Sequence, residues 1–153
     1  MWEVLGGLFV WTMIGGVIPV INTELMVVVT AVTLSSQGAP LVVAVATLGQ
    51  MITKTSLFFL ARWAPSRLPE KACGALDRGH DWIERHGGAT GSLIFLSAAL
   101  GLPPFYAISL AAGALDVRWP LFVGLGTLGR AIRFGALAWA GLHFGEEALQ
   151  LFT

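Results

Sequence analysis

Four long apolar runs dominate this chain and limit the solvent in which it can fold. They cover residues 4–21, 41–61, 92–115 and 121–142. Each is long enough to reach into or cross a hydrocarbon core of about 30 Å, which takes about 20 helical residues. Only 12% of the residues are charged, whereas a soluble domain carries about 25%. We therefore expect an all-α integral membrane protein, because backbone amides in lipid must be paired within their own segment.

Half of the charged residues are concentrated in one loop, residues 62–88. It holds five of the nine Lys and Arg residues, which predicts a cytoplasmic position by the positive-inside rule. Residues 69–85 have helical periodicity and predict a short helix along the membrane surface; the alternative is a solvated linker. His80 and His86 have no Cys or carboxylate at convincing ligand spacing, so we expect no metal site.

Two of the apolar runs are interrupted by proline, which removes an amide donor and bends or ends a helix. In the third run the arms 91–101 and 105–115 are each roughly 16 Å long as helices, about half the membrane. This length predicts a re-entrant hairpin, with a kinked spanning helix as the alternative. The predicted residues of the two hairpin turns are Pro19, Asn22, Thr23, Pro103 and Pro104.

A repeated phrase relates the two halves of the chain. PLVVAVATLG at 40–49 returns as PLFVGLGTLG at 120–129, and seven of the seventeen pairs from 40/120 to 56/136 are identical. If 91–115 re-enters the membrane, the helices that begin at the two prolines run in opposite directions, as in the inverted repeats of many transporters. We expect one membrane domain, with repeat 1 at about 4–62, a cytoplasmic amphipathic segment at 63–88 and repeat 2 at about 90–145.

Polar residues fall near the expected membrane midplane in both copies. Charges at that depth cost at least about 2.5–3.5 kcal/mol each, and three cations against one acid leave an excess of about +2. Such a cavity would attract an anion, and arginines favour phosphate. The predicted substrate-binding residues are Arg130, Arg133, Lys54, Gln50 and Thr53.

Each charged residue also has an alternative role. The two arginines would instead form an ion pair with Glu24 or bind backbone carbonyls, and Lys54 would extend toward the cytoplasm. Glu24 is the candidate proton carrier, because burial raises the pKa of a carboxyl group while a nearby arginine lowers it. Its alternative role is to complement the positive end of the helix that follows the first break.

The chain resembles the DedA superfamily, also called the VTT or SNARE-associated membrane domain. The resemblance is carried by PVINTEL at 19–25, ATLGQMITKTSLFFLAR at 46–62, GALDVRWPLF at 113–122 and GRAIRF at 129–134. It implies two facing re-entrant hairpins, transport of lipids between leaflets and a bacterial inner-membrane location. Glu24 would match the acidic residue of the family. The chain departs from the family at Ala99, Leu102 and Tyr106, where many members carry arginine.

The expected function is therefore that of a scramblase or flippase for phospholipids or polyprenyl phosphates, with proton coupling as an option. Two alternatives stay open: a proton-coupled transporter of a small soluble anion, and a non-transporting membrane assembly protein. We expect no enzymatic activity and no cofactor, because no nucleophile with a nearby base, phosphate loop or metal cluster is evident. The expected partners are membrane lipids with an anionic headgroup, and a homo-oligomer is an option. Nucleic acid is not expected, because the net charge is zero and the basic residues form no stripe.

Overall fold

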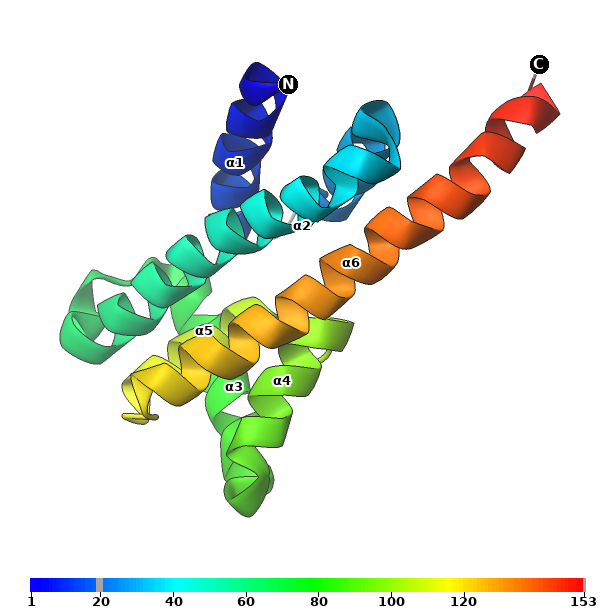
Figure 1. Ribbon diagram of the computed structural model, residues 1–153. Coiled ribbons are helices and arrows are strands. Elements are labelled where there is room, and N and C mark those ends of the chain that lie inside the picture. Colours follow the sequence, from blue (N-terminus) through cyan, green and yellow to red (C-terminus); the bar gives the residue numbers. More distant parts are fainter. Residues whose placement is uncertain (19–20, 153) are drawn as a thin grey trace. The chain divides into compact units, whose positions relative to one another are not determined.

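The computed structural model describes residues 1–18 and 21–152, with side chains described through residue 145. It is 89% helix, and no strand occurs among the described residues. The prediction of an all-α chain is confirmed. Two short 3₁₀ turns, Pro65–Arg67 and Gly87–Ala89, flank α3. The helices in chain order are α1 (Trp2–Val17), α2 (Thr23–Trp63), α3 (Glu70–Arg85), α4 (Thr90–Leu100), α5 (Phe105–Ala114) and α6 (Trp119–Phe152) (Figure 1).

Both predicted breaks lie where the prolines place them. The first separates α1 from α2, and Asn22 caps α2 by accepting a hydrogen bond from the Leu25 amide at 3.1 Å. Pro19 lies outside the described residues. The second break separates α4 from α5, so the arms predicted at 91–101 and 105–115 are confirmed to within one residue.

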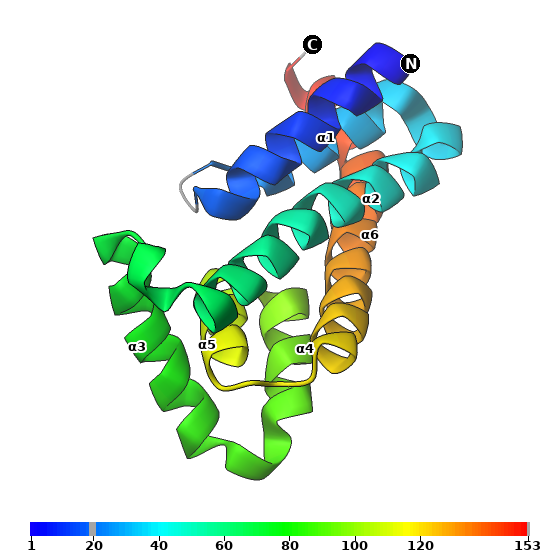
Figure 2. The same ribbon diagram turned by 90° about the vertical axis from the view of Figure 1, so that its left-hand side faces the viewer.

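The second break is a tight turn. Gly101 adopts a left-handed backbone, with φ of 81°, which glycine reaches without steric penalty. The Ser97 hydroxyl donates a 2.6 Å hydrogen bond to the Pro103 carbonyl, so the turn is fastened to α4. Pro104 is the N-cap of α5. The chain therefore reverses into a helical hairpin (Figure 2).

The two proline-led segments differ in how they begin. α2 includes both the arm that follows the first break and the helix that contains Pro40, with non-helical backbone at Ser35 between them. Pro120 is the second residue of α6, where its missing amide would have no helical partner. Ser35 and Asp116, which precede the two prolines, have φ of 59° and 55°.

The chain forms two compact units. The first consists of Met1–Gln50 and Ala131–Thr153, and the second of Met51–Arg130. Both α2 and α6 contribute residues to each unit. The core of the first unit includes Leu8, Val27, Val42 and Phe134, all fully buried.

In the second unit α2 and α6 run in opposite directions. Met51 lies against Gly126, and further along α2 the ring of Phe58 stacks on Phe122 with centroids 4.8 Å apart. The residue numbers of the contacting residues therefore increase along α2 while they decrease along α6. Phe105 at the start of α5 also stacks on Phe122, at 5.7 Å, so the three rings join α2, α5 and α6.

The repeated phrase has the same surface pattern in both copies. Residues 41–50 and 121–130 have the same degree of exposure at nine of ten paired positions, the exception being buried Thr47 and half-buried Thr127. The identical leucine and isoleucine pairs are all exposed: Leu41 and Leu121, Leu48 and Leu128, Ile52 and Ile132. Both copies lie in helices long and apolar enough to cross a membrane, α2 and Trp119–Gly145 of α6.

The glycine near the end of each copy lies in close contact with another helix. A Cβ at Gly49 would lie 3.0 Å from the Phe9 carbonyl oxygen of α1, and one at Gly129 would lie 2.8 Å from the Phe95 carbonyl oxygen of α4. Each proline-led helix therefore approaches the helix before the preceding break at a position where a side chain would be crowded.

The helix predicted over 69–85 is confirmed as α3, and the solvated linker is wrong. α3 packs along α5 within the second unit (Figure 2). The contact is close at Gly79, where a Cβ would lie 2.8 Å from the Ala107 carbonyl carbon and 2.9 Å from the Ala111 Cβ.

We predict that Gly79→Leu will detach α3 from α5, because the neighbouring atoms include backbone that cannot move aside. Backbone amides of α5 should then exchange hydrogen faster in detergent, as measured by mass spectrometry. Gly74→Leu is the matched control, since no atom lies within 4 Å of its Cβ position. Equal exchange in both variants would contradict the predicted role of Gly79.

Candidate functional site

Two buried cations in the second unit face neighbouring aromatic rings. Lys54 on α2 is 4% exposed and Arg130 on α6 is 9% exposed. The Lys54 Nζ lies 5.1 Å from the centre of the Tyr106 ring, and the Arg130 guanidinium carbon lies 5.0 Å from the centre of the Phe105 ring. Contacts of this kind stabilise a cation by about 0.5–2 kcal/mol without neutralising its charge.

The ring residues place both cations at the start of α5. Phe105 and Tyr106 are its first two residues, directly after Pro103 and Pro104. The first amides of a helix have no carbonyl partner within the helix, and the helix dipole favours an anion there. The second hairpin turn therefore lies within an electropositive part of the protein.

Arg133 has a different role from Arg130. It lies in the first unit, where its Nε donates a 2.8 Å hydrogen bond to Oε1 of Glu24, and its Nη2 contacts the same oxygen. Both side chains are half-buried. The alternative of an ion pair with Glu24 is thus what the structure shows for Arg133. The carboxylate of Glu24 therefore offsets the charge of Arg133. The remaining excess of positive charge near the expected midplane comes from Lys54 and Arg130.

The amide of Gln50 belongs to the first unit as well. Its Nε2 donates to the Thr23 hydroxyl at 3.3 Å, which links the middle of α2 to the residue that follows the first break. Thr53 is buried in the second unit. The predicted site residues are thus divided: Glu24, Gln50 and Arg133 lie in the first unit, and Thr53, Lys54 and Arg130 in the second.

Neither a family model nor a curated protein nor a solved structure matches this chain. Its functional interpretation therefore depends on the geometry of its own residues.

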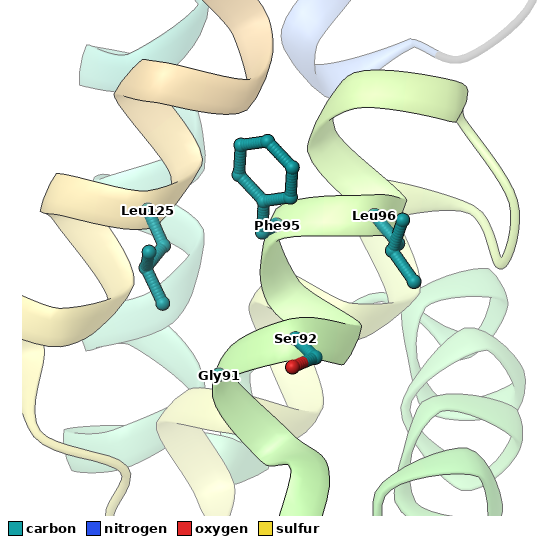
Figure 3. A pocket seen from close by; sticks show the side chains of 5 residues that line it. All are labelled: Gly91, Ser92, Phe95, Leu96 and Leu125. Atoms are coloured by element: carbon teal, nitrogen blue, oxygen red, sulfur yellow. The ribbon is translucent and has the colours of Figure 1, made fainter.

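An apolar groove opens between α4 and α6 in the second unit. Its volume is about 490 Å³, and its lining residues are Gly91, Ser92, Phe95, Leu96 and Leu125. Figure 3 shows Leu125 projecting from α6 and the other side chains from α4. Ser92 supplies the only side-chain oxygen of this lining, so the groove suits hydrocarbon better than a charged group.

Three potential metal ligands meet on α3, although the sequence spacing predicted no metal site. The ligand atoms of His80, Asp81 and Glu84 lie within 4.8 Å of one another, and His80 Nδ1 is 3.6 Å from Glu84 Oε1. Both acids are exposed and His80 is half-buried. This arrangement is an ordinary pairing along a helix surface.

Sequence reasoning did not assign a role to the two aromatic residues beside the buried cations. Phe105 and Tyr106 were not expected to contact Lys54 and Arg130. The sequence does contain one indication of these contacts. An aromatic pair directly follows the Pro-Pro turn, in a chain with an excess of buried cations. Tyr106 faces a lysine from another helix.

Proposed function

We propose that this chain is an integral membrane protein of the DedA superfamily that moves lipids with a phosphate-bearing headgroup between leaflets. In this proposal its membrane is the bacterial inner membrane, with residues 62–88 in the cytoplasm. The observation that carries the proposal is the pair of buried cations, Lys54 and Arg130, at the start of α5.

Membrane insertion is supported by what the chain exposes. All six tryptophans have at least 43% of their surface exposed, and the exposed leucines and isoleucines recur on both long helices. A soluble protein rarely leaves so large an apolar surface in water. In a bilayer the same residues contact acyl chains, and Trp63 and Trp119, at the end of α2 and the start of α6, would lie at the headgroup level.

The proposed topology has two re-entrant hairpins and an inverted repeat. α4 and α5 have 11 and 10 residues, so each is roughly 16 Å long and reaches about half-way across the bilayer. The opposite directions of α2 and α6 in the second unit, and the glycine contacts of Gly49 and Gly129, favour this plan. α3, with its charged outer face, would lie along the cytoplasmic surface.

An anionic substrate follows from the chemistry of the two cations. An arginine binds phosphate through a planar fork of N–H donors, and a lysine binds it as a compact positive charge. The first amides of α5 add donors of the kind that bind phosphate at helix starts. Lys54, Arg130 and these amides would together hold the headgroup.

The apolar groove favours a lipid over a soluble anion. A soluble anion needs only a polar route, whereas a lipid needs a hydrocarbon-lined surface close to the headgroup site. The groove lined by Phe95, Leu96 and Leu125 is a hydrocarbon-lined surface in the same unit as the cations.

The test is translocation of fluorescent lipids in proteoliposomes. We expect the protein to speed the flip of phosphatidylglycerol above the rate in empty vesicles, measured by dithionite quenching with and without a pH gradient. A rate equal to that of empty vesicles would contradict lipid transport. Release of trapped inorganic phosphate without lipid flip would favour the soluble-anion transporter instead.

A further inference from the structure

Two buried side-chain oxygens in the first unit have no hydrogen-bond partner among the described residues. They are Oγ1 of Thr47 and Oε1 of Gln50, in residues only 4% and 5% exposed. Leaving such atoms unsatisfied is strongly unfavourable, and buried polar groups in native proteins are nearly always paired with protein or with an ordered guest.

The Thr47 hydroxyl differs from the other buried threonine hydroxyls of this unit. Thr12 donates to the Phe9 carbonyl at 2.9 Å, and Thr30 donates to the Met26 carbonyl at 2.7 Å. Both are therefore satisfied by their own helix, as is usual for threonine. The Thr47 hydroxyl has no such bond to its own helix.

A third oxygen is held next to Gln50. Thr47 and Gln50 are three residues apart on α2 and share one face of the helix, and the Gln50 amide nitrogen binds the Thr23 hydroxyl. The Thr23 side chain in turn lies directly against Gly15 of α1, where no Cβ would fit. Thr23 is the first residue after the break between α1 and α2.

We propose that Thr23, Thr47 and Gln50 form a binding site for one small ligand, here called the guest, that binds to oxygen atoms. The guest is either a water molecule or a sodium ion. Hydroxyl and amide oxygens accept hydrogen bonds from water and coordinate hard cations. These neutral oxygens would not attract phosphate. The site therefore differs in chemistry from the pair of cations Lys54 and Arg130, and it lies in the first unit whereas they lie in the second.

The isosteric change Thr47→Val tests whether a guest is present. If a guest is bound, the variant loses its contact, and the apparent melting temperature in detergent should fall roughly 2–6 °C below that of Thr30→Val. Thr30→Val is the matched control, because it removes a buried hydroxyl that its own helix satisfies. A melting midpoint for Thr47→Val at or above that of Thr30→Val would overturn the proposal, because the Thr47 hydroxyl would then be buried without any bound guest.

A second variant tests whether the oxygens share one guest. Combining Thr47→Val with Gln50→Leu should lower the midpoint by less than the sum of the single effects, because the guest can be lost only once. Additive effects would contradict a shared site. A rise of the wild-type midpoint in sodium chloride over choline chloride that Thr47→Val lacks would identify sodium; equal midpoints would identify water. This test measures stability alone, so it stands or fails independently of lipid transport.

Discussion

Arg130→Gln should slow lipid translocation in proteoliposomes by roughly 10- to 100-fold, which corresponds to the loss of one charge-assisted contact with a phosphate. The guanidinium is buried against the Phe105 ring at the start of α5, so its loss removes both a charge and a fork of donors from the proposed headgroup site. The dithionite assay on phosphatidylglycerol measures the effect directly.

Three comparisons separate this role from general damage. Arg130→Lys keeps the charge but not the planar fork, so we expect an intermediate rate. Lys54→Gln should resemble Arg130→Gln, because both cations act on the same headgroup. Arg118→Gln, at an exposed position before α6, should transport like the wild type. Wild-type rates for Arg130→Gln would remove the proposed headgroup site.

Gly113→Val should strongly destabilise the second unit. A Cβ at this position of α5 would lie 2.8 Å from the carbonyl carbon and 3.0 Å from the Cα of Phe58 on α2. Because the obstacle is backbone, the two helices must separate, and we expect a loss of about 3 kcal/mol or more. That corresponds to a fall of roughly 6–12 °C in the apparent melting temperature.

Gly124→Val provides the control for this prediction. Gly124 lies in α6 of the same unit, and no atom is found within 4 Å of its Cβ position. Its replacement adds a β-branched residue to a helix without a steric clash, so the midpoint should move by only a few degrees. Similar midpoints for Gly113→Val and Gly124→Val would show that α5 and α2 do not pack as closely as described.

The breaks and helices were predictable because local chemistry decides them. Proline and glycine at 101–104 end α4 whatever surrounds them, and Asn22 caps α2 through a contact within one turn. The junction at Ser35 was not predictable. No proline or glycine stands at that position, and the arm after the first break joins the Pro40 helix as one long element. The division of both long helices between two units also depends on contacts between distant residues, which periodicity does not reveal.

The candidate site was predictable in its residue types but not in its pairing. The excess of cations over acids identified Lys54, Arg130 and Arg133 as residues needing partners. The excess of cations did not indicate that Arg133 pairs with Glu24 or that Arg130 faces Phe105. Such choices depend on how helices from different parts of the chain meet, and one-dimensional spacing carries no information about them.

The matched exposure of the two repeats has a consequence for insertion. Residues 41–50 and 121–130 have the same degree of exposure at nine of ten paired positions, so if the repeats are inverted as proposed, a bilayer would meet nearly the same pattern in either orientation of the molecule. The hydrophobic surface would then give the insertion machinery little basis for choosing an orientation. That choice would rest on the basic residues of the segment joining the repeats, Arg62, Arg67, Lys71, Arg78 and Arg85.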